Sequence, residues 1–284
     1  RYEHRGPHMK REWVDQALKL ARTEASFYSG CRKILQARRV TFKGFHDSGE
    51  DAIVMSDAGY TKSKTTMLTK NYLHQESKAV AIDLWAKRRG QAKYGSVGFT
   101  CYNHFVKGGS IDAKRSKRAS VFGPCIQSVV LTWISKTELT VDLFYRTTEW
   151  LKKFPADLVF LRDVLLQGFD LAGMKVTAVN CHFANITIHP MYFVTVLPHI
   201  EDPIRELERI KKADEFFWKW LIKWSARYIC DEYSRGIQKF AQAMRVRKDA
   251  TERLTPAKLK LLQDYFRANH PGHRNDYAED DEEE

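Results

Sequence analysis

Three side chains in the segment 120–157 have the chemistry to act on a nucleotide. Cys125 follows a Gly-Pro turn, Arg146 ends a predicted strand, and Asp157 lies in the first turn of a predicted helix. A thiolate is a nucleophile, a guanidinium binds phosphate oxygens in pairs, and a carboxylate accepts hydrogen bonds. Because about one hairpin separates these residues, the segment predicts a nucleotide-modifying site.

Two segments of alternating apolar residues would position these groups. Residues 129–134 and 139–145 are expected to form a hairpin around residues 135–137. Its first strand follows the cysteine, and its second strand ends at the arginine. Pro155 suits the first turn of a helix that begins near Ala156.

This arrangement resembles the core of the thymidylate synthase family. That family has Pro-Cys-His, then Gln-Arg-Ser-x-Asp, then Leu-Pro-Phe-Asn at nearly the same separations. The resemblance covers roughly residues 72 to 200 and implies an α+β fold with a mixed β-sheet flanked by helices. The matching segments are PC at 124–125, YRTTEW at 145–150, FPAD at 154–157, VNCHFANITIHP at 179–190, and the folate-side residues Tyr72, Leu73, His74, Trp85, Ala86, Gly90, Tyr94 and Gly95.

The resemblance assigns catalytic and cofactor roles. It implies that the Cys125 thiolate adds to C6 of a pyrimidine and that Tyr94 helps to remove the proton from C5. It implies 5,10-methylenetetrahydrofolate as the cofactor that supplies the one-carbon unit. Glu149 replaces the family's aspartate on the pterin side, and Trp85 belongs to the folate-side stretch.

Substrate-binding roles follow from the same resemblance. Arg146 and Thr147 match the family's Arg-Ser grip on the phosphate of a nucleoside monophosphate. Gln127 would line the pocket, and His182 matches a histidine near the sugar. The family's tyrosine two residues later is Ala184 here, which leaves the choice between ribose and deoxyribose open.

A basic cluster at 114–118 precedes the cysteine. In the family, a paired-arginine turn upstream of the cysteine crosses a dimer interface and holds the partner's substrate phosphate. The resemblance therefore implies a homodimer, with Arg115 and Arg118 as phosphate ligands. A solvated basic turn is the alternative.

Asp157 departs from the family pattern in an informative way. Thymidylate synthases have an asparagine there, whose amide matches O4 and N3–H of uracil. An ionised aspartate offers only acceptors, which suit the 4-amino group of cytosine, and phage deoxycytidylate hydroxymethylases resemble this chain in having it. We therefore expect dCMP as the substrate. A first-turn acid favoured by the helix dipole is the alternative.

Two family elements are missing. No Arg-Thr-Gly phosphate loop follows Arg38 and Arg39, and no glutamate lies at the family's general-base spacing. The nearest carboxylates to that position are Asp57 and Glu50. These absences favour the alternative of a synthase-like scaffold that acts as a nucleic-acid-binding or regulatory protein. A uracil-nucleotide modifier, in which Asp157 has a different role, also remains open.

The net charge indicates which classes of ligand the protein can bind, and the cysteine pattern indicates its cellular compartment. The net charge is +12, and the last nine residues hold seven acids and no base, so the rest carries about +19. Nucleotides, folates or nucleic acid would all suit this charge. Five dispersed cysteines without a metal-binding spacing indicate a reducing compartment. With no apolar run of spanning length and no secretory signal, we expect a cytoplasmic protein without a membrane partner.

The expected organisation has four parts. Residues 1–9 look like a tag remnant, and residues 10–203 form a thymidylate synthase-like catalytic domain that starts with one long helix over 10–37. Residues 204–270 form a helical C-terminal extension packed on it, and 271–284 form an acidic disordered tail. The extension contains FFWKWLIKW at 216–224, which could pack in a core, bind a partner, or interleave aromatic and basic side chains for nucleic acid.

Overall fold

The computed structural model divides into two units, each described here by itself. The first unit comprises residues 1–20 and 24–189, and the second comprises residues 21–23 and 190–284. The structure describes residues 9–43, 96–100, 125–160, 175–234 and 251–270.

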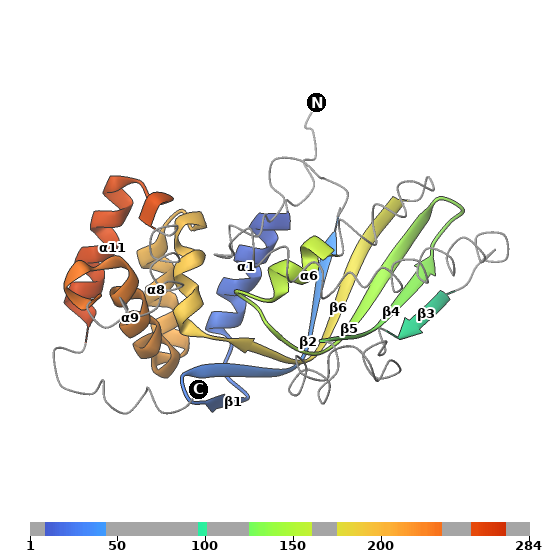
Figure 1. The fold of residues 1–284 in the computed structure, drawn as a ribbon, viewed down its shortest axis with the longest axis horizontal. Coiled ribbons are helices and arrows are strands. Elements are labelled where there is room, and N and C mark those ends of the chain that lie inside the picture. Colours follow the sequence, from blue (N-terminus) through green and yellow to red (C-terminus); the bar gives the residue numbers. More distant parts are fainter. Residues whose placement is uncertain (1–8, 44–95, 101–124, 161–174, 235–250, 271–284) are drawn as a thin grey trace, which may run out of the picture. The chain divides into compact units, whose positions relative to one another are not determined.

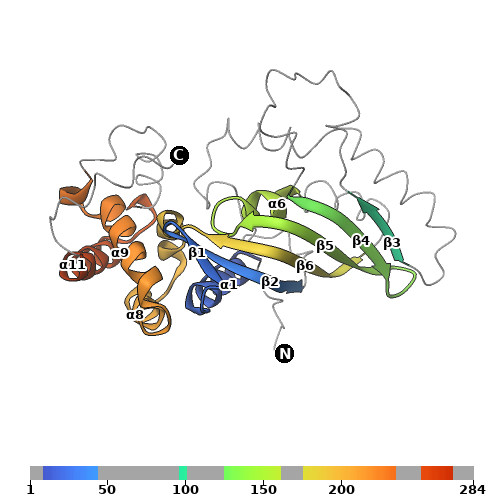
Figure 2. The same ribbon diagram turned by 90° about the horizontal axis from the view of Figure 1, so that it is seen from below.

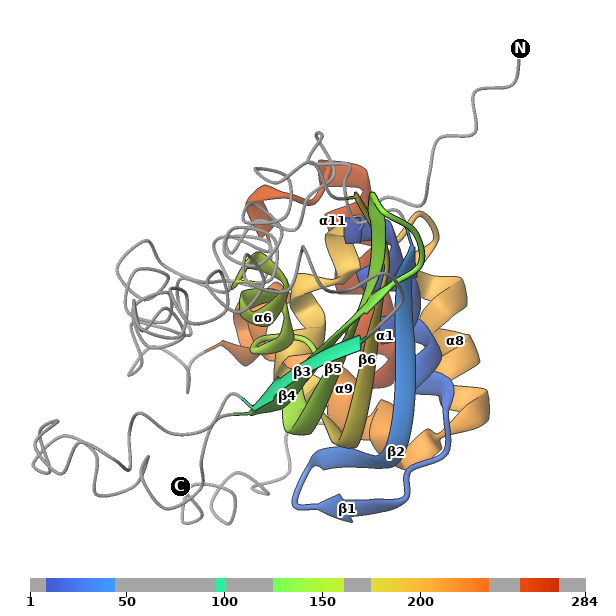
Figure 3. The same ribbon diagram turned by 90° about the vertical axis from the view of Figure 1, so that its right-hand side faces the viewer.

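The first unit is built on a mixed sheet, which is six-stranded in the described ranges and has the order β1-β2-β6-β5-β4-β3. β5 and β6 are parallel, and the other neighbouring pairs are antiparallel. The strands lie side by side in Figures 1 and 3. The predicted α+β class, with helices flanking a mixed sheet, is confirmed. The elements are α1 (Met9–Arg22), β1 (Phe27–Ser29), β2 (Arg32–Lys43), β3 (Ser96–Thr100), β4 (Ile126–Trp133), β5 (Glu138–Glu149), α6 (Phe154–Phe160) and β6 (Lys175–Ile188).

The predicted hairpin is β4 and β5 (Figure 2). Its register pairs Trp133 with Leu139, so the connection is residues 134–137. Alternate side chains on both strands are buried, as the sequence pattern predicts. β5 continues to Glu149 because it also pairs with β6, which the local pattern does not reveal.

The prediction of one helix over residues 10–37 is wrong beyond Arg22. α1 ends there, and β1 and β2 follow. Gly30 has φ +55°, a conformation that glycine tolerates, in the turn between these two strands. Further along, buried Leu35, Val40 and Phe42 face the core from a strand paired with β6. Long-range pairing therefore overrides the helical spacing that α1 establishes.

Aromatic rings join α6 to the sheet. Phe154, fully buried in α6, lies 4.3 Å from Trp150, 5.5 Å from Phe183 and 6.0 Å from Tyr145 between ring centroids. The indole Nε1 of Trp13 in α1 donates a 3.1 Å hydrogen bond to the carbonyl of Trp150. These contacts fix where α6 begins, immediately after β5.

The second unit is helical in its described residues. Among the described residues of this unit, α8, α9 and α11 each begin at a capping side chain: Asp202, Asp214 and Thr255 accept hydrogen bonds from main-chain N–H groups three residues later. The helices predicted within 204–247 and over 254–268 are confirmed in the described ranges, although the division between units falls at 189/190 instead of after residue 203. The elements are η3 (Pro190–Thr195), η4 (Leu197–His199), α8 (Pro203–Ala213), α9 (Glu215–Ile229), η5 (Asp231–Tyr233) and α11 (Pro256–Asn269).

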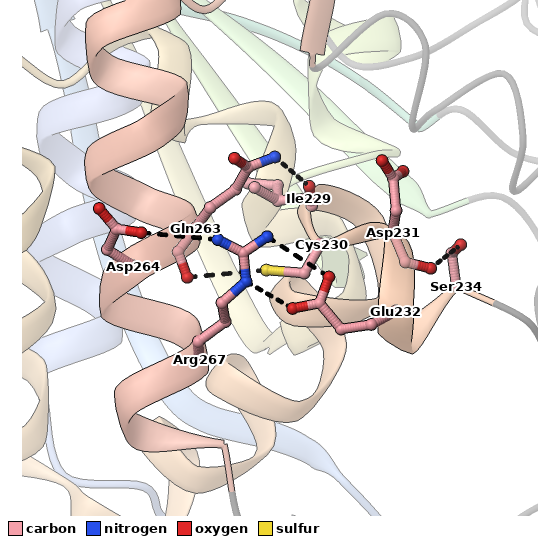
Figure 4. A network of polar contacts seen from close by, with 8 residues as sticks. All are labelled: Ile229, Cys230, Asp231, Glu232, Ser234, Gln263, Asp264 and Arg267. Atoms are coloured by element: carbon pink, nitrogen blue, oxygen red, sulfur yellow. Dashed lines mark hydrogen bonds and ion pairs between the residues drawn. The ribbon is translucent and has the colours of Figure 1, made fainter.

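Side chains of α11 hold the end of α9 (Figure 4). The amide Nε2 of Gln263 donates a 3.1 Å hydrogen bond to the carbonyl of Ile229. The guanidinium of Arg267 lies 2.5 Å from Glu232 and 3.5 Å from Asp264. Gln263 thus satisfies a carbonyl at a helix end that has no partner within the helix.

No helix in the described ranges combines the length and apolar character that a membrane crossing requires.

Candidate functional site

Cys125 and Arg146 are neighbours across the hairpin. The main-chain nitrogen of Arg146 donates a 2.9 Å hydrogen bond to the carbonyl oxygen of Cys125, one step beyond the pairing of Ile126 with Tyr145. Residues opposite each other on paired strands direct their side chains to the same side of a sheet. The thiol of half-buried Cys125 and the exposed guanidinium of Arg146 therefore share one side.

Two alanines extend this pair into a row, which we call the Cys125–Arg146 row. The neighbours of Arg146 on β5 pair with the neighbours of Ala184 on β6, so Arg146 lies opposite Ala184. In the same way, Ala184 lies opposite Ala37 of β2. Both alanines are exposed, so the surface beside Arg146 carries no bulky side chain from β6 or β2. Ala37 also has φ +48°, which is uncommon for a non-glycine residue and is enriched at functional sites.

His182 lies on the same side of the sheet as the row, two residues before Ala184 on β6. Its Nε2 is 2.9 Å from Oδ1 of Asp142, and its ring stacks on Phe144 at a centroid distance of 4.6 Å. The side chain of His182 is 30% exposed, so a ligand can reach the imidazole. Asp142 and Phe144 hold the ring in one orientation, which is what a sugar-binding histidine would need.

A second cation lies on this side of the sheet. Nη2 of Arg39 donates a 3.1 Å hydrogen bond to Oδ1 of Asn180, which also accepts a 2.8 Å bond from the hydroxyl of Thr41. Arg39 is exposed and is paired with His182 in the register of β2 and β6. The side that carries the row is therefore basic and rich in hydrogen-bonding groups.

Gln127 and Thr147 flank the row. Gln127 is exposed, and the register of β4 and β5 shifts between Ile126 and Ser128, which makes Gln127 the extra residue of a bulge. Thr147 is half-buried and follows Arg146 on β5. Bulges often lie next to active sites, where they change the direction of a side chain. Gln127 is such a residue, two positions after Cys125, and stays a predicted substrate ligand.

Glu149 is held by main-chain donors. One carboxylate oxygen accepts a 2.5 Å hydrogen bond from the nitrogen of Lys152, and the other accepts a 3.2 Å bond from the nitrogen of His189. Burial raises the pKa of Glu149 to about 7, although these N–H donors act in the opposite direction. A carboxyl group that titrates near neutrality is suited to exchanging a proton.

A second thiol lies in the same unit. Sγ of Cys31 is 3.6 Å from Nε2 of His189, and both side chains are half-buried. Burial, with the positive charges of Arg32 and Lys152, lowers the pKa of His189 to about 4, so its imidazole is neutral at pH 7. Cys31 provides a natural comparison for Cys125 because it too is a half-buried cysteine.

Asp157 lies in α6, which packs on the apolar side of the sheet. It lies in the first turn of that helix, with a relative exposure of 1%. Its negative charge adds to the effect of burial in raising the pKa of the Cys181 thiol. Phe154 packs α6 against Tyr145 and Phe183. These two residues immediately precede Arg146 and Ala184 on their strands, so their side chains face the other side of the sheet from the Cys125–Arg146 row. Strand pairing therefore does not bring Asp157 to Cys125 and Arg146.

Several predicted residues lie outside the described residues. The structure therefore gives no position for the predicted proton-transfer, folate-side and basic-cluster residues. These are Tyr94, Trp85, Arg115, Arg118, Asp57 and Glu50.

No protein-family model matches the chain. No curated protein matches it either.

Sequence reasoning missed part of the polar side of the sheet. Asp142, Phe144, Asn180 and Arg39 escaped it because their grouping depends on register between strands far apart in the chain. The available signal was alternation: Asp142 and Phe144 stand between the apolar residues that predict β5. The acid and the aromatic residue on the polar side of this strand contact His182, one of the polar positions of 179–190.

Proposed function

We propose that the chain catalyses folate-dependent modification at C5 of a pyrimidine nucleotide, by hydroxymethylation or methylation, with dCMP as the preferred substrate. The observation that supports this most directly is the hydrogen bond between Arg146 and Cys125, which sets a nucleophile beside an anion-binding group. The oriented imidazole of His182 on the same side adds a ligand for the sugar.

In this proposal the Cys125 thiolate adds to C6 of the base. The new S–C6 bond moves the electron pair of the C5–C6 double bond towards C5, which becomes the nucleophilic carbon. After C5 has gained the one-carbon unit, loss of the C5 proton, addition of water to that carbon and expulsion of the thiolate restore the ring and give the hydroxymethyl product. The methyl product would instead need a hydride, which the folate would supply. Arg146 and Thr147 hold the phosphate, so that C6 is fixed against the sulfur.

Asp157 supports cytosine as the base. Its carboxylate, when ionised, is an acceptor for the 4-amino group of cytosine, whereas uracil presents a carbonyl oxygen at that position. At 1% exposure, a mismatch between two acceptors is costly, which favours one base over the other. Asp157 belongs to α6, which follows the end of β5, and Cys125 precedes the start of β4. The proposal therefore requires the base to lie near these two strand ends.

Glu149 fits the donor edge of a pterin. Main-chain N–H groups, among them those of Lys152 and His189, donate hydrogen bonds to its oxygens and orient the carboxylate. When bound, 5,10-methylenetetrahydrofolate supplies the one-carbon unit. Trp85, the other proposed cofactor residue, lies outside the described residues.

The proposal includes a homodimer and a cytoplasmic location. In the dimer, Arg115 and Arg118 would reach the substrate phosphate of the partner. The location is supported by the five dispersed cysteines of the sequence, which lack the spacing of a disulfide framework, as expected in a reducing compartment.

The test is an assay of CMP, dCMP, UMP and dUMP with methylenetetrahydrofolate, with products identified by mass. We expect a hydroxymethyl or methyl adduct with dCMP, no product with Cys125→Ser, and retained activity with the matched thiol variant Cys31→Ser. Asp157→Asn should shift preference towards dUMP by at least about tenfold.

The outcomes separate the parts of the proposal. If the wild type is inert towards all four nucleotides, the enzymatic function is wrong. If it modifies dUMP in preference to dCMP, the chain is a uracil-nucleotide enzyme and the role given to Asp157 is wrong. Unchanged base preference in an active Asp157→Asn protein also contradicts that role.

A further inference from the structure

The helix α9 (Glu215–Ile229) has an unusual outward face. Its inward side is a continuous apolar surface that includes Phe217, Leu221 and Ala226. The residues of the other side recur at helical spacing. We call them the α9 outward face: Phe216, Lys219, Trp220, Lys223 and Arg227.

Aromatic side chains are out of place on this side of a helix, where charged and polar residues are the norm. Phe216 is 50% exposed, and Trp220, one turn further along, is partly exposed. The four-residue separation between them corresponds to a rise of about 6 Å, so the two aromatic side chains are neighbours along one side of the helix. Exposed apolar side chains that lie together on one surface are a feature of interaction sites.

Two cations of α9 lie over tryptophan rings of the same helix. Nζ of Lys223 lies 4.7 Å from the ring centroid of Trp220. One turn later, the guanidinium carbon of Arg227 lies 4.8 Å from the ring of Trp224. The outward face thus alternates positive charge with aromatic surface, and the cations stay with the rings through cation–π contact.

Lys219 adds a third positive charge to the face. Its Nζ is 3.1 Å from Glu215, but both side chains are more than half exposed, at 65% and 63%. Exposed ion pairs of this kind are weak and exchange readily with another anion. A ligand phosphate can therefore replace Glu215 as the partner of Lys219.

We propose that the α9 outward face binds single-stranded nucleic acid. Such a ligand offers both things that the face matches, a chain of phosphates for Lys219, Lys223 and Arg227 and unpaired bases that stack beside Phe216 and Trp220. A duplex keeps its bases stacked on one another, so it meets only the charge. The net charge of +12 gives the whole chain the sign that this ligand requires. This inference does not depend on the function proposed above.

The test is fluorescence anisotropy of the full chain with a labelled single-stranded oligonucleotide. We expect binding that weakens steeply between about 50 and about 200 mM salt. The double variant Lys223→Glu/Arg227→Glu should lower affinity by at least tenfold and reduce the salt dependence. Phe216→Ala/Trp220→Ala should lower affinity by at least about fivefold while leaving the salt dependence unchanged.

The matched controls lie on α11, which carries a similar exposed pair. Leu261 is 51% exposed and Lys260 is exposed, so Leu261→Ala and Lys260→Glu test an apolar and a charged change away from α9. Both should bind like the wild type. Thermal melts of every variant establish that the helices are folded.

Three results would overturn the inference. They are absence of oligonucleotide binding at about 50 mM salt, equal losses in the α9 and α11 variants, and binding to phosphatidylserine–phosphatidylcholine vesicles that α9 variants abolish while oligonucleotide binding persists. The last would assign the face to an anionic membrane surface instead.

Discussion

The carbonyl oxygen of Cys125 accepts a 2.9 Å hydrogen bond from the main-chain nitrogen of Arg146. This bond continues the pairing of β4 with β5, so two residues that the sequence separates by a hairpin occupy neighbouring positions on one side of the sheet. The paired backbone, and not a loop, thus sets the separation of the two residues along the sheet. Such sites on paired strands hold reacting groups with little conformational freedom.

Arg146→Ala should weaken nucleotide binding without unfolding the protein. The side chain is exposed, so its removal costs little stability, while the loss of charge-assisted hydrogen bonds to phosphate corresponds to about 2 kcal/mol. We expect KM for dCMP to rise by about tenfold or more, and kcat to change less. Steady-state kinetics check this, with Lys136→Ala in the exposed hairpin turn as the control. Equal effects of the two substitutions would contradict the assignment.

Phe154→Ala should destabilise the first unit strongly. The ring is fully buried and contacts Trp150, Phe183 and Tyr145, so its removal leaves a cavity between α6 and the sheet. The expected loss is about 3–5 kcal/mol in the free energy of unfolding, measured by denaturant titration. Ile134→Ala, at a position that is 53% exposed, should cost less than about 1 kcal/mol. A loss below about 1 kcal/mol for Phe154→Ala would show that α6 is not fixed by this ring.

Glu149 should make stability depend on pH. Its folded pKa is raised from 4.5 to about 7, so the folded state holds this proton more tightly than the unfolded chain. The stabilisation is complete below pH 4.5 and is lost as pH rises to about 7. Relative to Glu149→Gln, the wild type should therefore gain about 2 kcal/mol when pH falls through this window.

The comparison with Glu149→Gln removes the contribution of His189. Its folded pKa is lowered to about 4, so it acts in the opposite direction, with stability lost as pH falls below 6.5. Both proteins contain His189, and the difference between their unfolding free energies isolates Glu149. A difference that does not vary between pH 4.5 and 7 would contradict the raised pKa.

Gln263→Ala should destabilise the second unit more than Arg267→Ala. Gln263 satisfies the carbonyl of Ile229 at the end of α9, a bond whose loss costs about 1 kcal/mol. The Arg267 pair with Glu232 is exposed to solvent, and we expect no measurable change in the unfolding midpoint when it is removed. Denaturant titration of the two variants provides the comparison, and a larger effect of Arg267→Ala would reverse this ranking.

The hairpin was predictable because alternation is local. Val129, Leu131, Leu139 and Val141 show it within a few residues of each other. Capping residues also make the helices of the second unit predictable from the sequence: Thr255 and Pro256 are typical of a helix start and begin α11.

The rest depends on contacts between distant segments. β2 exists as a strand because it pairs with β6, more than a hundred residues later, and nothing near Leu35 announces that pairing. The polar side of the sheet has the same origin, since Arg39, Asn180 and Asp142 meet only through the registers of β2, β6 and β5. The sequence predicted Cys125 and Arg146 as neighbours because one hairpin connects them.

Release of tritium from C5 of labelled dCMP, in the presence of methylenetetrahydrofolate, tests the central claim most directly. The account predicts release by the wild type and by Cys31→Ser, and background release by folded Cys125→Ser. Release by Cys125→Ser at the wild-type rate, or none by the wild type, would contradict it.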